Sequence, residues 1–273
     1  GSTRRRWRRR SRSSDRVTDP VAPGAELGAD AARLGYRLFW TPRCGSTNDL
    51  ALSALRDGAE RLWVVAGEQV QGRGRLGRSW TPRPGNLYAS LGLIDPAPIA
   101  EAPQIGFVAA LAAHDAAAAV CGAEGFALKW PNDLLLDRLK AAGVLVEGTN
   151  VGQGRLGVAV GIGINVVDHP EATRYGATHL TTRRADATAA DVFAALSDAM
   201  ARRLSQWREG GFGSIRADWL ARAAGLGETI SIAQGEARVE GRFEGVDAQG
   251  RLVLAGPAGA QRIDAGDVFL SRM

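Results

Sequence analysis

The nine residues from Gly72 to Trp80, GRGRLGRSW, restrict the fold of this chain more than any other segment. Their three glycines let backbone N–H groups approach an anion without Cβ clashes, and their three arginines supply charge-assisted donors. The segment also fits the dinucleotide-binding pattern G-x-G-x-x-G and nearly fits the P-loop, in which a lysine would stand at Arg78. Both motifs must open a helix, but residues 81–86 read TPRPGN and lead into a strand-like segment. We therefore expect an anion-binding loop between two strands, or an ordinary basic surface loop, rather than a Rossmann or P-loop domain.

Lysine is rare in this chain. Of its 34 lysine and arginine residues, only Lys129 and Lys140 are lysines. An ammonium group is a compact point charge that can approach a single oxygen and change its pKa when buried, which distinguishes it from a guanidinium group. Both lysines lie within residues 127–147, ALKWPNDLLLDRLKAAGVLVE. We interpret this segment as a second part of a functional site, with chance retention of the two lysines as the alternative.

Length and composition indicate a globular protein. With 273 residues, 45% of them hydrophobic, the chain can bury a substantial core in one or two domains. Cys44 and Cys121 are far apart and lack metal-type spacing, which favours a reducing, cytoplasmic location. The histidines, His114, His169 and His179, are scattered, so the sequence supports neither a zinc site nor a histidine-based triad.

The net charge of +5 is concentrated in an N-terminal tail. Residues 1–16 carry eight arginines and one aspartate, a charge of +7, which leaves −2 for the remaining residues. We expect residues 1–34 to form a disordered arginine-rich tail and a linker with a short helical piece. The tail is interpreted as weakly nucleic-acid-binding, as a targeting arm, or as non-native sequence ahead of a start at Val17. Because the rest of the chain is not basic, we expect no specific DNA binding.

Apolar periodicity predicts a unit of mixed strands and helices over residues 35–225. The expected strands are 36–40, 61–69, 86–93, 126–130, 133–136, 143–148 and 155–167. The last of these is so apolar that it should lie centrally in the sheet. The expected helices are 48–55, 103–120, 189–207 and 215–224, with caps at Ser46 or Thr47 and at Thr188. Polar residues and a glycine interrupt the apolar helix 103–120, so we expect no membrane span.

The pattern changes at Glu228. From there the chain alternates apolar and polar residues in short runs, with turn signals at Gln249-Gly250 and at residues 257–259. We expect a small β-barrel or meander over residues 226–273. So small a unit is too weak to be very stable alone and should pack against the main domain.

Together these segments resemble the biotin protein ligase family, over about Arg37 to Met273. Six motifs stand in the family's order: GSTN at 45–48, Glu68-Gln69, the loop at 72–80, KWPND at 129–133, Lys140 ahead of GVLVE at 143–147, and G-x-G-x-N at 161–165. The resemblance implies an α+β fold, with a class II synthetase-like catalytic domain built on a mixed sheet and an SH3-like C-terminal β-barrel. Too few residues precede the first expected strand for a helix-turn-helix module, so we expect no N-terminal DNA-binding domain.

The resemblance implies an ATP-dependent biotin protein ligase. ATP would activate biotin as biotinyl-5′-AMP with release of pyrophosphate, and biotin would then pass to a lysine of a biotin carboxyl carrier protein. Mg²⁺ is expected with ATP and not on histidine or cysteine ligands. Two anionic groups must meet before reaction, and one preorganised donor is typically worth about 3 to 4 kcal/mol of that stabilisation.

Individual roles follow from the same resemblance. The implied biotin-binding residues are Ser46, Thr47, Asn48, Gln69, Gly72, Arg73, Gly74, Arg75, Lys140, Gly143, Gly161 and Gly163. The implied ATP-binding residues are Arg75, Arg78, Trp80, Asn132, Lys140 and Asn165. The implied catalytic residues are Arg75, Lys140 and Asp133, with Asp133 as the base for the carrier lysine. Gly161 and Gly163 should leave room beside the bicyclic ring of biotin, and residues 72–80 should close over the adenylate as a lid.

Two departures from the family and several alternatives stay open. Cys44 is interpreted as a small buried filler, because no histidine is placed to activate it, and Ala141 stands where the family commonly has a larger aliphatic residue. A lipoate-protein ligase-like enzyme and a nucleic-acid-binding protein that acts through the tail are the alternatives, and the complete loop and KWPND block favour biotin. Assembly stays open between a monomer and a homodimer that pairs through a sheet edge beside residues 161–167.

Overall fold

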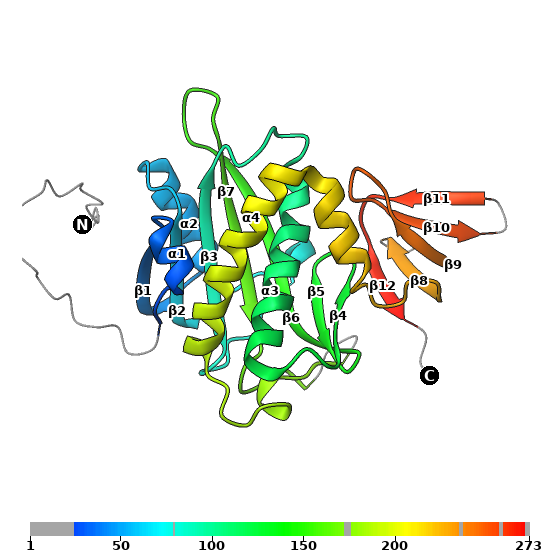
Figure 1. Ribbon diagram of the computed structural model, residues 1–273, viewed down its shortest axis with the longest axis horizontal. Coiled ribbons are helices and arrows are strands. Elements are labelled where there is room, and N and C mark those ends of the chain that lie inside the picture. Colours follow the sequence, from blue (N-terminus) through cyan, green and yellow to red (C-terminus); the bar gives the residue numbers. More distant parts are fainter. Residues whose placement is uncertain (1–24, 79, 172–175, 235–236, 257–258, 271–273) are drawn as a thin grey trace, which may run out of the picture.

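The computed structural model describes residues 25–78, 80–171, 176–234, 237–256 and 259–270. It contains two β-sheets, a large one with helices on both faces and a small one formed by the C-terminal residues (Figure 1). Residues 1–24 of the expected tail lie outside the described ranges, as do Pro257 and Ala258 of an expected turn. The short helix expected in the linker is α1 (Ala29–Arg33).

The large sheet has seven strands. They are β1 (Arg37–Cys44), β2 (Leu62–Gln69), β3 (Leu87–Ile94), β4 (Phe126–Lys129), β5 (Asp133–Leu136), β6 (Leu139–Asn150) and β7 (Leu156–Ile164). Their order is β1-β2-β3-β7-β6-β5-β4, with β1 and β2 parallel and every other neighbouring pair antiparallel. The mixed sheet and the central position of β7 confirm the prediction. Because β7 pairs with both β3 and β6, the sheet edge that we considered for a homodimer beside residues 161–167 does not exist.

The two faces of β7 differ in side-chain size. One face carries Val158, Val160, Ile162 and Ile164, all buried in the main hydrophobic core. The other face carries small residues, which are Gly157, Ala159, Gly161 and Gly163. Since side chains alternate along a strand, the apolar sequence of β7 produces a packed face and a nearly bare one.

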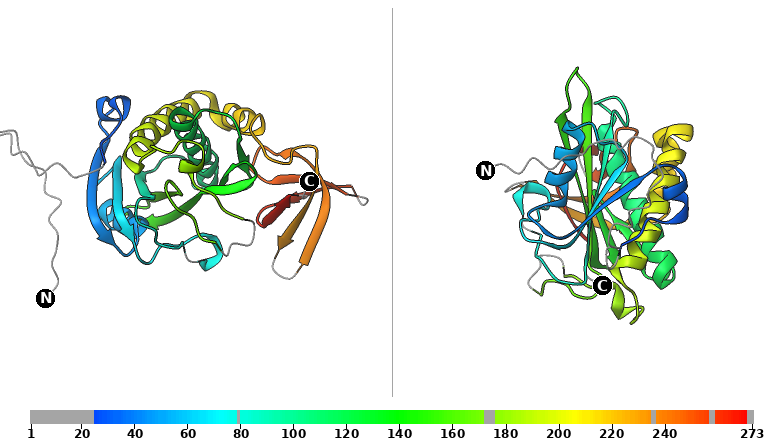
Figure 2. Two further views of the ribbon diagram at one scale, coloured as in Figure 1. Left: turned by 90° about the horizontal axis from the view of Figure 1, so that it is seen from below. Right: turned by 90° about the vertical axis from the view of Figure 1, so that its left-hand side faces the viewer.

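Helices cover both faces of the large sheet. α2 (Thr47–Arg56) packs on the bare face of β7, where Ala51 and Ala54 join Ala159 in a small apolar cluster. α3 (Ile105–Cys121) and α4 (Ala189–Leu220) cover the opposite face (Figure 2). The hydroxyl of Ser46 accepts a hydrogen bond from the Asp49 N–H, so Ser46 is the cap of α2. Three short 3₁₀ helices complete the unit, at Arg75–Gly77, Ala102–Gln104 and Leu180–Thr182.

α4 joins two segments that we expected to be separate helices. Thr188 caps it as predicted, accepting a hydrogen bond from the Asp191 N–H. The helix kinks at Gly211, whose φ of 64° is outside the helical region, and then continues to Leu220. The two segments are therefore distinct in backbone conformation, as expected, and meet at this kink. After the kink, the ring of Phe212 packs with its centroid 5.3 Å from that of Phe107 on α3, which anchors the second segment.

α3 is a core helix of this fold. By length and composition alone, residues 102–121 are apolar enough to cross a membrane, with a mean hydropathy of 1.4. However, 67% of that stretch is buried inside the protein, between the sheet and α4. A carboxylate–guanidinium pair, Asp115–Arg203 at 2.7 Å, links α3 to α4.

The small sheet is antiparallel. Its strands are β8 (Thr229–Gln234), β9 (Ala237–Val246), β10 (Leu252–Gly256), β11 (Gly259–Ile263) and β12 (Asp267–Leu270), in the order β11-β10-β9-β8-β12. The turn at Gln249-Gly250 is as predicted, with Gly250 at a φ of 85°. The chain enters this sheet along the edge of the large one, because Leu128 of β4 donates to the Arg222 carbonyl and accepts from the Ala224 N–H. The domain limits at 35–225 and 226–273 stay a prediction.

Candidate active site

A pocket of about 460 Å³ opens on the α2 face of the large sheet. Every residue that the sequence assigned to the site lines it, except Gly72. They are Ser46, Thr47, Asn48, Gln69, Arg73, Gly74, Arg75, Arg78, Trp80, Asn132, Asp133, Lys140, Gly143, Gly161, Gly163 and Asn165. Tyr88, Leu145 and Asp267 also line the pocket, although the sequence assigned them no role. Individual ligand contacts stay predictions.

One wall of the pocket is a hydrogen-bond network between α2 and the sheet. The side-chain oxygen of Gln69 accepts from both the N–H and the hydroxyl of Thr47, each at 2.8 Å. The hydroxyl of Ser90, fully buried on β3, lies 2.7 Å from the Thr47 hydroxyl and 2.6 Å from the Asn48 side-chain oxygen. Gly72 borders this network, since a Cβ atom there would lie 2.5 Å from the Gln69 side-chain nitrogen. A side chain at Gly72 would therefore displace the Gln69 amide, although Gly72 does not itself line the pocket.

Asn48 connects three elements. Its NH₂ group donates to the Leu145 carbonyl at 3.3 Å and to the Glu147 carboxylate at 2.6 Å, while its oxygen accepts from Ser90. A Cβ atom at Gly161 would collide with that oxygen. Asn48 thus occupies the position that a side chain at residue 161 would take, while Gly161 itself lines the pocket, and its place beside biotin stays a prediction. No motif includes Ser90, although a serine in the apolar run of β3 was a signal that could have been used. Glu147 ends the GVLVE motif, but it was given no role.

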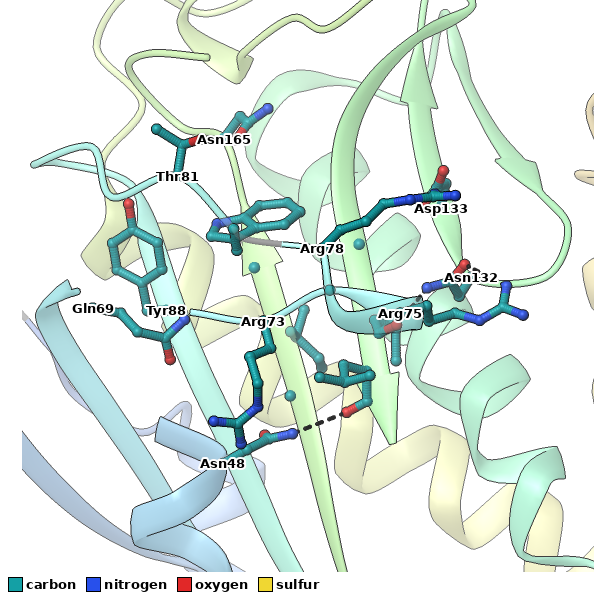
Figure 3. A pocket seen from close by; sticks show the side chains of 18 of the residues that line it. Asn48, Gln69, Arg73, Arg75, Arg78, Thr81, Tyr88, Asn132, Asp133 and Asn165 are labelled. Atoms are coloured by element: carbon teal, nitrogen blue, oxygen red, sulfur yellow. Dashed lines mark hydrogen bonds between the residues drawn. The ribbon is translucent and has the colours of Figure 1, made fainter. Parts of the chain in front are cut away.

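The three arginines of the glycine–arginine loop, residues 72–80, reach in different directions (Figure 3). Arg73 donates to both carboxylate oxygens of Asp49 on α2, which raises the pKa of its guanidinium. Arg75 is half-buried beside Asn132 at 3.4 Å, and burial lowers the pKa of its guanidinium. Arg78 pairs with Asp267 of β12 and so links the loop to the small sheet. Closure of this loop over a ligand stays a prediction.

Trp80 lies on two glycines. A Cβ atom at Gly163 would lie 2.8 Å from the indole ring, and one at Gly143 would lie 3.2 Å from it. The ammonium group of Lys140 stands 5.6 Å from the ring centroid, within the range of a cation–π contact. Glycine at these positions therefore lets the indole approach the sheet, and the place of Gly163 beside biotin stays a prediction.

Lys129, Asp133 and Lys140 form a charged cluster at the other end of the pocket. Lys140 Nζ lies 2.6 Å from one oxygen of Asp133, and Lys129 Nζ lies 3.3 Å from the other. Burial alone would raise the pKa of the Asp133 carboxyl, but the two ammonium groups outweigh it and hold that pKa below its usual range. Asp133 is therefore ionised, the form that a base requires, and its role as base for the carrier lysine stays a prediction.

The two asparagines assigned to ATP are held by the backbone. Asn132 donates to the Val144 carbonyl at 2.5 Å. Asn165 donates to the carbonyls of Thr178 at 3.0 Å and Lys140 at 3.4 Å. Both amides are thus oriented by the fold before any ligand arrives.

Cysteine and histidine take no evident chemical role in this pocket. Cys44 is only partly buried and not fully buried as expected, but burial and the nearby Asp49 raise the pKa of its thiol to about 11, which fits an unreactive side chain. His169 and His179, which we described as scattered, meet with their Nδ1 atoms 2.7 Å apart. Burial, and secondarily the neighbouring His169, lower the pKa of His179. Among the described residues there is no group of three or more histidine, cysteine, aspartate or glutamate side chains that could hold a metal ion.

Comparisons with known proteins agree with this site. Residues 40–165 match the model of the biotin/lipoate A/B protein ligase family, and residues 225–271 match that of the biotin protein ligase C-terminal domain. These two matches coincide with the large sheet and the small sheet.

Relatives of known structure or activity extend over most of the chain. A biotin–[acetyl-CoA-carboxylase] ligase of Paracoccus denitrificans is 43% identical over 83% of this chain and 98% of its own length. The biotin–[acetyl-CoA-carboxylase] ligase of Mycobacterium tuberculosis is 34% identical over 82% of this chain and 85% of its own length. The biotin protein ligase of Aquifex aeolicus in complex with biotin and ATP superposes with a TM-score of 0.73, at 28% identity, over 87% of this chain and 99% of its own. The mixed sheet, the pocket motifs and these matches agree, and the chain belongs to the biotin protein ligase family.

Proposed function

We propose that this protein is an ATP-dependent biotin protein ligase, which forms biotinyl-5′-AMP and transfers biotin to a specific lysine of a biotin carboxyl carrier protein. The observation that carries the proposal is the pocket itself, in which one polar wall and one cationic end, drawn from six separate motifs, face a single cavity. The relatives of Paracoccus denitrificans and Mycobacterium tuberculosis carry the name of this activity.

The polar wall suits the ureido ring of biotin. Ser46, Thr47 and Gln69 offer hydroxyl and amide groups that are already ordered by mutual hydrogen bonds. A buried ureido group needs several such partners, because an unpaired polar group in a pocket costs free energy. We therefore assign this wall to biotin recognition, together with Arg73 and the backbone of Gly74.

The cationic end suits the reacting groups. In the first step a carboxylate oxygen of biotin attacks the α-phosphorus of ATP, an O–P bond forms, and the bond to pyrophosphate breaks. Lys140 and Arg75 can neutralise the carboxylate and the developing charge on phosphorus. In the second step the carrier lysine attacks the acyl carbon, an amide forms and AMP leaves. We assign Asp133 to holding Lys140, while its role as the base that takes the proton of the carrier lysine stays a prediction.

Other residues of the same pocket are assigned to the nucleotide and its metal ion. We propose that Trp80 flanks adenine, that Arg78 contacts phosphate, and that Asn132 and Asn165 lie at the nucleotide. Mg²⁺ prefers oxygen ligands and keeps several waters when it accompanies a nucleotide, so it would be held mainly by the phosphates, beside the amide oxygens of these asparagines. When bound, the ion adds to the neutralisation of phosphate charge.

Three broader assignments complete the proposal. The catalytic domain covers residues 35–225, and the C-terminal domain covers 226–273. Two free thiols, Cys44 and Cys121, suit a reducing cytoplasm. The acceptor is the carrier domain of an acyl-CoA or pyruvate carboxylase.

Exchange of labelled pyrophosphate into ATP tests the activity directly. We expect exchange that depends on biotin and is not supported by lipoate at equal concentration. Exchange supported by lipoate and not by biotin would replace the proposal with the lipoate-ligase alternative. Absence of exchange with both acids in a folded protein would remove the ligase proposal.

A further inference from the structure

The only two lysines of this chain, Lys129 and Lys140, bind the same carboxylate. They come from different strands, Lys129 from the end of β4 and Lys140 from the start of β6, and Asp133 opens β5 between them. Side-chain exposure differs within the cluster, at 6% for Lys129, 10% for Asp133 and 28% for Lys140. Lys140 is therefore the cation that faces the pocket, and Lys129 is the one that lies behind it.

With two lysines on Asp133, one of them can leave during the proposed reaction without leaving the carboxylate unpaired. Lys140 must leave Asp133, at least in part, to contact the carboxylate of biotin and the phosphate oxygens. A buried carboxylate that loses its only cation is strongly destabilised, because the lost pairing is not replaced by water. With Lys129 on its second oxygen, Asp133 keeps a partner throughout, and Lys140 can move at a smaller cost.

Lys129 is itself held from the other side. Its ammonium group donates to the Val268 carbonyl of β12 at 3.4 Å, so its position depends on the small sheet as well as on Asp133. The carboxylate of Asp267, also on β12, attracts the ammonium group of Lys129. These contacts keep Lys129 in place when Lys140 turns toward a ligand.

We propose that Lys129 is a positioning residue that keeps Asp133 ionised and paired while Lys140 transfers its contact to the reacting oxygens. The inference rests on the proposed ligase function. It assigns Lys129 an effect on the rate of adenylate formation through Asp133, without contact to biotin or ATP.

A double-mutant cycle with Asp133 tests the inference. Lys129→Gln keeps a donor for the Val268 carbonyl but removes the charge. In the otherwise unchanged protein we expect kcat for biotin-dependent pyrophosphate exchange to fall at least about thirtyfold, with KM for biotin changed less than about threefold. In the Asp133→Asn background, where no carboxylate needs a partner, the same substitution should change kcat less than about threefold. Equal losses in the two backgrounds, or a near-normal Lys129→Gln protein, would overturn the inference.

The pH profile gives a second readout that a purely structural role would not move. The charged groups around Asp133 are Lys129, Lys140, Arg75, Arg78 and Asp267. Without Lys129, protonation of Asp133 is the remaining way to release Lys140. The rate of Lys129→Gln relative to the unchanged protein should therefore rise as pH is lowered from neutral toward the acid limit of the fold. A pH-independent ratio contradicts the inference. Lys129→Met repeats both measurements if Lys129→Gln does not fold.

Arg138→Gln is the matched control. It removes another charged contact of the C-terminal part of the chain, the pair of Arg138, in the turn between β5 and β6, with Glu228, the residue before β8, at 3.1 Å. We expect kcat of this variant to stay within about threefold of the unchanged protein. A loss as large as that of Lys129→Gln would assign the effect to contact with the C-terminal part of the chain and overturn the inference. Failure of the unchanged protein to exchange pyrophosphate would instead reject the ligase function.

Discussion

At the scale of the residue, Lys140 occupies a space that fits an ammonium group. Its Nζ atom lies 2.6 Å from Asp133, and a Cβ atom at Gly143 would lie only 3.2 Å from Nζ. The indole ring of Trp80 closes a further side. A planar guanidinium group is wider and spreads its charge over three nitrogens, so it would not fit this space in the same way.

Lys140→Arg should therefore fail almost as badly as Lys140→Ala, although it preserves the charge. We expect a loss of at least about a hundredfold in adenylate formation, on the order of 2.7 kcal/mol, with little change in Tm. Pyrophosphate exchange and thermal unfolding measure the two effects. Near-normal exchange by a folded Lys140→Arg protein would leave the rarity of lysine in this chain unexplained.

Motifs predicted most of the pocket residues but not how they contact one another. Lys140 and Asp133 were assigned to one site from the sequence, whereas their pairing with Lys129 depends on strand register. Glycines were the hardest residues to interpret. A missing side chain at Gly161 makes room for a neighbour, but sequence does not say that Asn48 occupies the position of that side chain.

At the scale of the element, α3 and α4 are joined by a partly buried ion pair as well as by apolar packing. Burial alone would raise the pKa of Asp115, but contacts with His114 and Arg203 outweigh it and hold that pKa at about 2. Its folded-state pKa is thus below the ordinary value near 3.9. Such a group stabilises the fold above about pH 4, and the contribution is lost as pH falls toward about 2.

Asp115→Asn should lower the free energy of unfolding at pH 7 by roughly 2 kcal/mol. Urea unfolding of both proteins at pH 7 and near pH 3 measures the difference, which should shrink at the lower pH. Asp186→Asn is the control, because its pair with Arg184 is exposed and should contribute nothing measurable. A difference that is the same at both pH values would show that Asp115 does not act through its charge.

The presence of each helix was predicted more accurately than the residues at which it begins and ends. The caps at Ser46 and Thr188 were correct because a short polar side chain ahead of an apolar period is a local signal. The break between the two helical segments 189–207 and 215–224 was also predicted, and it falls at Gly211, where the backbone leaves the helical region. The contact of Phe212 with α3 could not be predicted, because it joins residues about a hundred positions apart.

At the scale of the whole molecule, the excess positive charge and the pocket residues lie in different parts of the chain. The excess positive charge lies in residues 1–16, outside the described ranges, whereas the pocket is lined by residues between Ser46 and Asp267. Polycationic segments bind nucleic acid through phosphate contacts that weaken steeply with salt. The tail and the pocket should therefore act independently.

Deletion of residues 1–16 should leave biotin transfer intact, as measured with a purified carrier domain. A tenfold fall in turnover, about 1.4 kcal/mol of transition-state stabilisation, would contradict this independence. Salt-sensitive binding of DNA that is lost with the tail agrees with it. Specific duplex binding at physiological salt that survives the deletion would contradict the expected absence of specific DNA binding.

The arrangement of the two sheets was beyond sequence reasoning. Both sheets were expected, but the contact of Arg78 with Asp267 joins residues 189 positions apart. No local pattern specifies which strand of a small antiparallel sheet will meet a distant loop. The order of the strands along the chain does not show that β7 lies between β3 and β6. Only the apolar character of β7 indicated a central position.

The glycines on the bare face of β7 affect both the stability of the strand and the shape of the pocket. Glycine inside a strand weakens it, because it has no side chain to pack and loses more conformational freedom on folding. A larger residue at Gly161 or Gly163 would favour the strand conformation, yet it would displace Asn48 or Trp80 from the wall of the pocket. The most central strand of the sheet thus keeps glycines with low strand preference, because the space that a side chain would need is taken by Asn48 and Trp80.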